Sequence, residues 1–144
     1  MGLFSIGYEG LPADEVLARL QDAHVEVLAD VRLNPQSRKR GLSKRGLAAS
    51  LEGAGIGYVH LPALGNPKDN RDAFRRHEPA AWDRYRAQFE TTPADDALDE
   101  LTELAREHRV AVLCYEHEHA SCHRSVVIDE VVRREPSLAD VTEL

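Results

Sequence analysis

Four short apolar runs, each followed by a segment with helical spacing, limit the folds open to this chain more than any other feature. They are Leu3 to Tyr8, Val25 to Arg32, Tyr58 to Leu61 and Arg109 to Tyr115, with a weaker run around Ala139 to Thr142. Strands that alternate with helices predict parallel pairing, right-handed crossovers and helices on both faces of the sheet. We therefore expect an α/β fold, a three-layer α/β/α single domain over residues 1–144, with a mainly parallel sheet of about four to five strands.

The residues between the runs carry ordinary helix signals. Pro12, followed by acids in the first turn, and Pro93 are typical of helix starts. Trp82, Tyr85 and Phe89 recur at helical spacing, which usually indicates core packing. The expected helices run from Pro12 to Ala23, from Ser43 through Leu51, from Ala80 to Glu90, from Pro93 through Leu104 and from Ser121 to Arg134, and residues 68–79 are expected to form a loop with a short helical piece.

Charge and cysteine content narrow the function classes. The formal net charge is −7, which argues against a protein that coats nucleic acid through bulk electrostatics. The N-terminus lacks the basic flank and long apolar core of a signal peptide, and no apolar stretch approaches the length of a membrane span. We expect a cytoplasmic protein without membrane contact, whose two cysteines are free thiols in a reducing compartment.

The reactive groups of the chain are concentrated in residues 114–124, directly after the last strong apolar run. This window contains Cys114 and Cys122 together with histidines, carboxylates and Arg124. In a parallel sheet the carboxyl ends of all strands lie at one edge, which is where such sheets bind ligands. That edge is expected to bring together Tyr8, Glu9, Asp30, Arg32, the loop after His60, Cys114 and Glu116.

Several short phrases resemble those of the Domain of Unknown Function 488 family. They are Ser5-Ile6-Gly7-Tyr8, Asp30-Val31-Arg32 with Asn34-Pro35 and Ser37-Arg38, Leu64-Gly65, Leu113-Cys114-Tyr115-Glu116 and Cys122-His123-Arg124. The likeness spans nearly the whole chain, and its Asp-Val-Arg and Cys-x-Glu-x5-Cys-His-Arg signals are specific when they occur together. It implies a compact cytoplasmic domain of bacterial or archaeal type and no particular activity, so the chemistry has to follow from the residues themselves.

The residues at this edge favour an enzyme that acts on an anionic ligand, such as a nucleotide, a phosphorylated sugar or an end of nucleic acid. Arg32, Arg38 and Arg124 are predicted to hold phosphate through charge-assisted bonds. The helix start at Ser121 offers free backbone N–H groups to the same anion. The loop Tyr8-Glu9-Gly10 adds a ring and a carboxylate, Tyr8 and Glu9, which are predicted to stack on and hydrogen-bond a base or sugar.

Catalysis is assigned to acids of the same edge. Glu116 is the predicted general base or nucleophile, and Asp30 is the second acting carboxylate. His123 is a candidate partner acid, and Cys122 with His123 is expected to shape the pocket at the helix start.

Two simpler interpretations of the same residues stay open. The cleft can bind an anion, including nucleic acid, without any catalysis. Alternatively, Asp30 and Glu116 pair with Arg32 and Arg124 in a buried ionic network, because structural networks also cluster charges.

Thiol and metal chemistry are the further alternatives. A cysteine at a strand end is similar to the arrangement in rhodaneses, and a thiol at a helix start, such as Cys122, is expected to have a lowered pKa. Glu116 and Glu118 weigh against this for Cys114, because nearby negative charge raises a thiol pKa. Ligand types for zinc are present in Cys114, His117, His119, Cys122 and His123. Their spacing departs from the paired spacing of structural zinc sites, so we expect no metal and no other cofactor.

Overall fold

The computed structural model describes residues 2–144 and, within them, shows a five-stranded sheet in which every pairing is parallel. The strands are β1 (Gly2–Gly7), β2 (Val27–Asp30), β3 (Gly57–His60), β4 (Arg109–Cys114) and β5 (Val141–Glu143). Their order across the sheet is β3-β2-β4-β1-β5. The predicted α/β class and parallel sheet are therefore confirmed.

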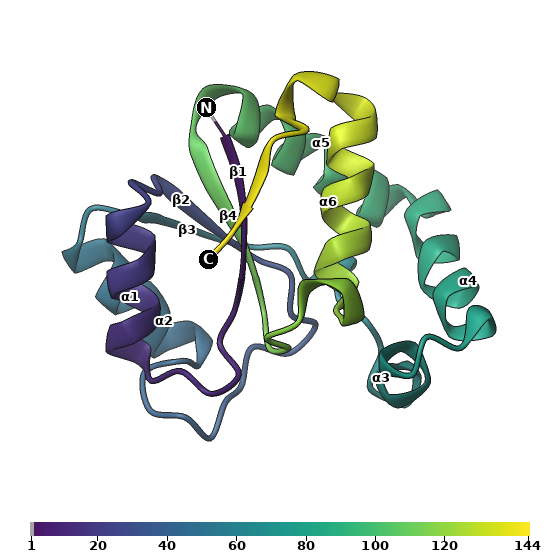
Figure 1. Cartoon of the computed structure of the whole chain (residues 1–144), viewed down its shortest axis with the longest axis horizontal. Helices are drawn as coiled ribbons and strands as arrows, with labels where there is room; N and C mark the ends of the chain where they lie inside the picture. Colours follow the sequence, from purple (N-terminus) through teal and green to yellow (C-terminus); the bar gives the residue numbers. More distant parts are fainter. Residues whose placement is uncertain (1) are drawn as a thin grey trace.

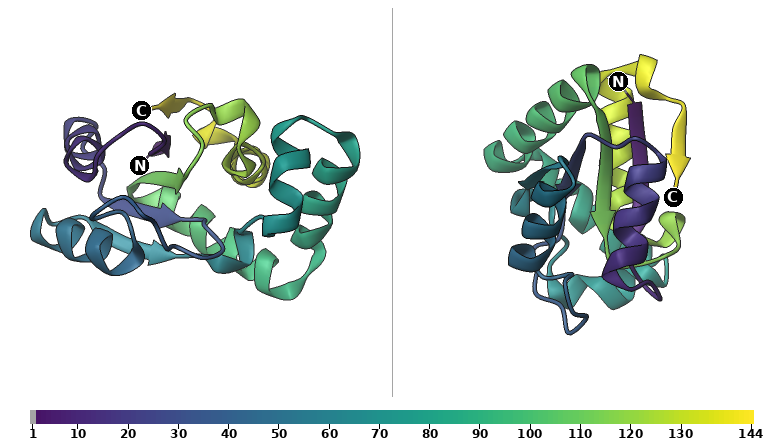
Figure 2. Two further views of the ribbon diagram at one scale, coloured as in Figure 1. Left: turned by 90° about the horizontal axis from the view of Figure 1, so that it is seen from below. Right: turned by 90° about the vertical axis from the view of Figure 1, so that its left-hand side faces the viewer.

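Helices cover both faces of this sheet. Within the same residues they are α1 (Ala13–Asp22), α2 (Lys44–Gly53), α3 (Lys68–Arg75), α4 (Pro79–Ala87), α5 (Thr92–Glu107) and α6 (His123–Arg134). Figure 1 shows α1 and α2 on one side of the strands and α5 and α6 on the other, with α3 and α4 beyond α6, and the views in Figure 2 agree. The three-layer α/β/α arrangement is thus the one that alternating strands and helices predict.

Strand side chains alternate between two apolar clusters, one on each face of the sheet. Val112 and Cys114 point into the cluster that includes α5 and α6, whereas Leu113 points into the cluster that includes α1 and α2. Both faces are buried, which explains why the strands are continuous apolar runs. The same alternation places Ala29 on the α6 side and the neighbouring Asp30 on the α2 side.

Expected and observed elements differ mainly at their ends. The run Val25 to Arg32 was expected to be a strand throughout, but only Val27–Asp30 has strand structure. Ser43 directly precedes α2, as predicted, although its side chain caps no backbone N–H of the described residues. The polar stretch 68–79 contains a full helix, α3, and α4 ends at Ala87 before a 3-10 turn reaches Glu90.

The connections around β4 create a crevice at the carboxyl ends of the strands. The chain leaves β1 and β2 toward α1 and α2, whereas it leaves β4 toward α6 on the opposite face. Two glycines let the loops close around this point. A Cβ on Gly7 would lie 1.9 Å from the carbonyl oxygen of Glu116, and one on Gly65 would lie 2.4 Å from Leu33 Cα. Both positions therefore need glycine for a close backbone approach.

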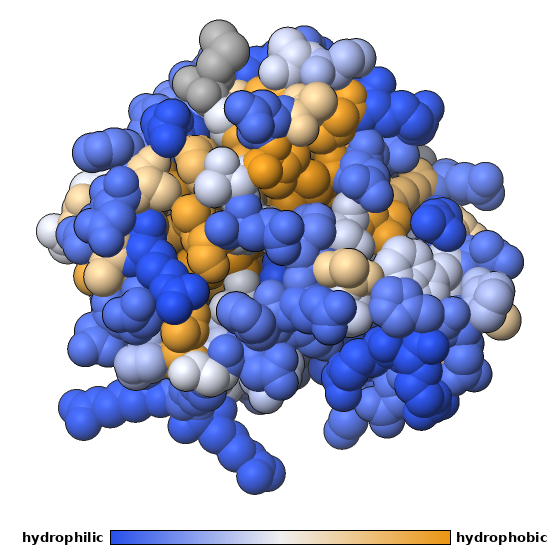
Figure 3. Space-filling view, viewed as in Figure 1, coloured by the Kyte–Doolittle hydropathy of each residue, from blue (hydrophilic) through white to orange (hydrophobic). Residues whose placement is uncertain are grey.

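Figure 3 shows the same face of the molecule as Figure 1. Hydrophilic side chains dominate its lower edge, where the strands end and the loop after β2 projects, and apolar surface shows between β5 and α6. None of the helices within residues 2–144 combines the length and apolar character that crossing a membrane requires.

Candidate functional site

A pocket of about 460 Å³ lies at the carboxyl ends of the strands. Its walls come from the segments after β1, β2 and β4, from the first residue of α6 and from α3. Its charged and reactive lining residues include Tyr8, Arg38, Arg71, Cys114, Glu116 and His123. Segments distant in sequence thus meet at one edge, as strand direction predicts, and the volume is in the usual range for small-molecule sites.

Asp30 is fully buried and accepts four hydrogen bonds. Arg32 donates three of them, from its backbone N–H (3.1 Å) and Nε (2.9 Å) to Oδ1 and from Nη2 (2.7 Å) to Oδ2. The phenol of Tyr58 donates the fourth, at 2.6 Å to Oδ2. Arg32 also donates through Nη1 to Tyr8 Oη (3.3 Å) and to the carbonyl oxygen of Leu42 (2.7 Å).

These contacts favour a structural role for the pair. Burial alone would lower the pKa of Arg32, but Asp30 and Tyr8 raise it above the usual value, so the guanidinium keeps its charge in the interior. Asp30 is not among the lining residues of the pocket, and the donors of Arg32 are directed at protein acceptors. The buried-network alternative therefore describes the geometry of Asp30 and Arg32 better than the assignment of catalysis to Asp30.

A second cluster, the thiol–imidazole cluster Cys114, Glu116, Cys122 and His123, lies on the α6 side of the same edge. Cys114 Sγ lies 3.5 Å from His123 Nδ1 and donates to Glu116 Oε2 at 3.6 Å. Cys122 Sγ lies 3.9 Å from His123 Nδ1. The other ring nitrogen, Nε2, donates to the carbonyl oxygen of Val31 at 3.0 Å. In the neutral ring that bond leaves Nδ1 as the nitrogen with a lone pair. Burial lowers the pKa of His123, but Cys122, the carbonyl oxygen of Val31 and Glu116 together raise it above its usual value.

Burial and local charge set the protonation of this cluster. Burial and the neighbouring Cys114 raise the pKa of the Cys122 thiol well above its usual value, which reverses the lowering expected for a thiol at a helix start. Burial alone would raise the pKa of Glu116. Its own backbone N–H, Cys122, His123 and Arg75 outweigh that effect, so the pKa lies below its usual value. Glu116 is therefore ionised at neutral pH, and Cys122 is a thiol.

Arg124 organises the loop between β4 and α6. Its Nε donates to Ser5 Oγ at 2.6 Å, and its Nη groups donate to the carbonyl oxygens of Glu116 and, at 3.0 Å, His117. Ser5 Oγ in turn contacts His119 Nδ1 at 2.7 Å. Arg124 thus contacts backbone carbonyls, not the Glu116 carboxylate, and it lies outside the lining of this pocket.

Two other predicted ligand residues also face the protein. Ser121 Oγ lies 3.0 Å from His77 Nε2, and Glu9 Oε1 accepts the backbone N–H of His117 at 3.0 Å. Neither residue is among those that line the pocket, whereas Tyr8 lines it and packs edge-to-face against Tyr115, with ring centroids 5.3 Å apart.

The pocket rim carries cations without carboxylate partners. Within residues 2–144, Arg38, Lys39 and Arg71 form no ion pair, although all three line the pocket. Lys39 Nζ donates to the carbonyl oxygens of Tyr8 (2.9 Å) and Leu11 (3.2 Å), and Arg71 Nε donates to that of Asn66 (2.9 Å).

Arg71 and its neighbour Arg75 were not predicted as site residues. Arg75 Nη2 lies 3.5 Å from Glu116 Oε1. Both arginines belong to α3, in a polar stretch expected to be mostly loop, and no pattern in that stretch indicates which of its charges faces the strand ends.

Comparison with known proteins supports the family suggested by the sequence phrases. No curated protein and no solved structure matches the chain. The family described as "Domain of unknown function DUF488" matches it over residues 12–131, which include the segment after β2, the whole of α3 and the thiol–imidazole cluster. The chain therefore belongs to the Domain of Unknown Function 488 family.

Proposed function

We propose that this protein is an enzyme whose pocket binds a small anionic, phosphate-bearing substrate and transforms it with the groups at the pocket floor. The observation that carries the proposal is the combination of Arg71, whose Nη groups bond to no residue of the described part of the chain, with Glu116 and His123 in one cavity.

Cations at the rim supply the binding energy for an anion. No hydrogen bond to a described residue occupies the Nη groups of Arg71, while the bond from Nε to Asn66 fixes the direction of the side chain. A guanidinium presented in this way suits bidentate recognition of phosphate. Arg38 is exposed at the same rim and adds a second positive charge. These two residues support anion binding better than Arg32 and Arg124, whose donors are directed at the protein.

The floor of the pocket supplies the reactive groups. Glu116 is ionised and half-buried, so it is the better acting carboxylate, and His123 lies next to it beneath the rim. The edge-to-face pair Tyr8 and Tyr115 offers an aromatic wall against which a base or sugar ring can pack. Hydrolysis or group transfer on a nucleotide or sugar phosphate fits this combination of charges.

Binding and turnover are tested separately. The probes are inorganic phosphate, nucleoside phosphates and sugar phosphates, with binding measured by calorimetry and turnover by product release. Arg71→Met is expected to weaken binding of inorganic phosphate by about tenfold or more, because a charge-assisted bond contributes roughly 1.5–3 kcal/mol. The matched control is Arg76→Met, which removes an exposed arginine just after α3 that pairs with Glu78 instead of lining the pocket.

Glu116→Gln separates an enzyme from a binding module. We expect it to abolish turnover while phosphate binding persists, because the carboxylate acts on the substrate and the rim cations hold it. Binding of these probes by wild-type protein without turnover of any of them would instead favour the non-catalytic module, and absence of binding would refute the proposal.

A further inference from the structure

We propose that Cys114, Glu116, Cys122 and His123 form a binding site for a divalent ion of the zinc type at the pocket floor. The inference deepens the proposed function and rests on it only for the catalytic use of the ion. The ligand set differs from the one that the sequence spacing suggests, because Glu116 takes the place of the loop histidines His117 and His119.

The ligand atoms lie close to the separations that such an ion requires. One donor atom from each residue lies within 4.8 Å of all the others. In a tetrahedral site with bonds of about 2.3 Å to sulfur and about 2.0 Å to nitrogen or oxygen, ligand atoms stand roughly 3.3 to 3.8 Å apart, and a sulfur and a nitrogen or oxygen about 3.5 Å apart. The observed separations from Cys114 Sγ to His123 Nδ1 and to Glu116 Oε2 are 3.5 and 3.6 Å, and that from Cys122 Sγ to His123 Nδ1 is 3.9 Å.

His123 has the outer contact that is typical of a metal-binding histidine. Its Nε2 donates to the carbonyl oxygen of Val31 at 3.0 Å, which fixes the tautomer of the neutral ring and leaves Nδ1 on the side of Cys122 Sγ. One adjustment is needed. Cys114 Sγ lies almost as close to Nε2 (3.6 Å) as to Nδ1, so it lies over the face of the ring and must move toward the Nδ1 lone pair when an ion binds.

The donor types and charges select the ion. Two sulfurs, an imidazole and a carboxylate suit zinc better than magnesium or calcium, which prefer oxygen ligands. Loss of both thiol protons on binding gives the ligands three negative charges with the Glu116 carboxylate, and Arg75, 3.5 Å from that carboxylate, offsets part of the excess over a divalent ion.

The position of the cluster suggests how the ion takes part in the reaction. Cys114, Cys122 and His123 are buried, whereas Glu116 is only half-buried and lines the pocket with Cys114 and His123. Three buried ligands and a fourth on the pocket side resemble a catalytic zinc site more than a closed structural one, because a substrate or water can replace the fourth.

His117 and His119 serve as the matched controls. His119 Nδ1 is engaged with Ser5 Oγ, and His117 is exposed in the loop. Neither belongs to the group of four donor atoms within residues 2–144.

The test is titration of metal-free, reduced protein with Co²⁺ under anaerobic conditions, followed by displacement with Zn²⁺. We expect one Co²⁺ per chain, visible bands of a tetrahedral site, a near-ultraviolet thiolate-to-cobalt band, and release of protons to the buffer. Cys122→Ser, a nearly isosteric change, should weaken binding by at least about tenfold and reduce the thiolate band. The double variant His117→Gln/His119→Gln should bind as wild type does. A cooperative thermal unfolding transition of Cys122→Ser without Zn²⁺ would establish that this variant is folded. Zn²⁺ should raise the unfolding temperature only of proteins in which the cluster is intact.

The outcomes distinguish failure of the metal site from failure of the proposed function. Wild-type protein that gains no thiolate band and no thermal shift overturns the metal site, as does a double histidine variant that loses them. Phosphate binding that depends on Arg71 in a protein without cobalt bands leaves the proposed function standing without the ion. Cobalt bands in a protein that neither binds nor turns over the phosphate probes support the metal site and refute the proposed function.

Discussion

Asp30→Asn tests whether the buried pair with Arg32 holds the strand ends together. Asp30 has no exposed surface and accepts three hydrogen bonds from Arg32 and one from Tyr58. Asparagine keeps the shape but has one acceptor oxygen and no charge. If Nδ2 replaces Oδ2, it faces the Tyr58 hydroxyl and Arg32 Nη2; if it replaces Oδ1, it faces two other donors of Arg32.

The expected cost follows from leaving the Arg32 cation buried without its anion. Removal of one partner of a buried ion pair typically costs about 3–5 kcal/mol. A chain of this size has roughly 5–15 kcal/mol of stability in total, so the variant should lose a large share. Tyr58→Phe removes only the phenol donor and leaves the ion pair intact, so it should cost less, about 1.5–3 kcal/mol.

Urea unfolding at neutral pH, followed by circular dichroism and by the fluorescence of Trp82, measures both variants. With a urea dependence of about 1–3 kcal/mol per molar, Asp30→Asn should shift the midpoint downward by roughly 1–5 M. A variant within about 1 kcal/mol of wild type would refute the reasoning. If such a stable variant also lost turnover, Asp30 would have to be regarded as a catalytic group and not as the anchor of Arg32.

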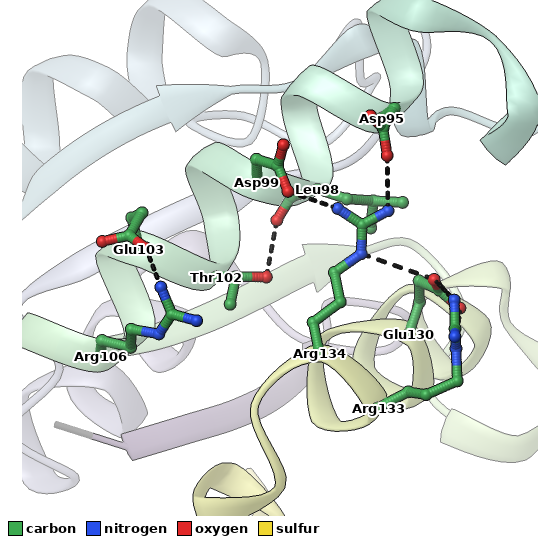
Figure 4. Close-up of polar contacts among 9 residues, drawn as sticks. All are labelled: Asp95, Leu98, Asp99, Thr102, Glu103, Arg106, Glu130, Arg133 and Arg134. Carbon is green, nitrogen blue, oxygen red and sulfur yellow. Dashed lines mark hydrogen bonds and ion pairs between the residues drawn. The ribbon is translucent and has the colours of Figure 1, made fainter.

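Three further predictions concern other parts of the structure. Gly7→Ala should cost about 3 kcal/mol or more, because its Cβ overlaps the carbonyl oxygen of Glu116, whereas Gly53→Ala at the end of α2 meets no atom of the described residues within 4 Å and should be neutral or stabilising in urea unfolding. Arg134→Met should cost about 1 kcal/mol at low salt and less at high salt, because Arg134 links carboxylates of α5 and α6 (Figure 4). Burial raises the pKa of Tyr58, helped by the Asp30 carboxylate, so the folded state keeps a proton that the unfolded state loses above about pH 10. Stability should therefore be complete below that pH and fall as pH rises beyond it, and Tyr58 should contribute to tyrosinate absorbance only on unfolding.

The fold was predictable from sequence because its signals are local. Each buried strand is a continuous apolar run, and the segments between them carry helical spacing and prolines at helix starts. The direction of parallel strands then fixes which residues meet at the ligand edge, so the convergence of Tyr8, Arg32, Cys114 and Glu116 followed without any contact information. Strand ends were less predictable, because the backbone leaves the ladder where Arg32 turns back to bind Asp30.

Side-chain partners were not predictable in the same way. The sequence places Asp30 two residues before Arg32 but does not show that Arg32 binds both carboxylate oxygens, a geometry that favours a structural role for Asp30. Arg124 resembles a phosphate ligand in sequence, yet its donors are directed at the Ser5 hydroxyl and at the carbonyl oxygens of Glu116 and His117. Arg71 comes from a helix with no distinguishing pattern, so only its position in space identifies it.

The residues that identify the family fall into two groups, one on each face of the sheet. Side chains alternate along each strand, so Asp30 and its partner Arg32 lie on the α2 side while Cys114 lies on the α6 side. Asp30 and Arg32 are engaged mainly with each other and with Tyr58, Tyr8 and Leu42, and these contacts fix the strand ends. Residues of the second group, His123 with Cys114 and Glu116, line the cavity with an imidazole, a thiol and an ionised carboxylate. Stability measurements should therefore detect changes in the first group most strongly, whereas ligand and metal measurements should detect changes in the second.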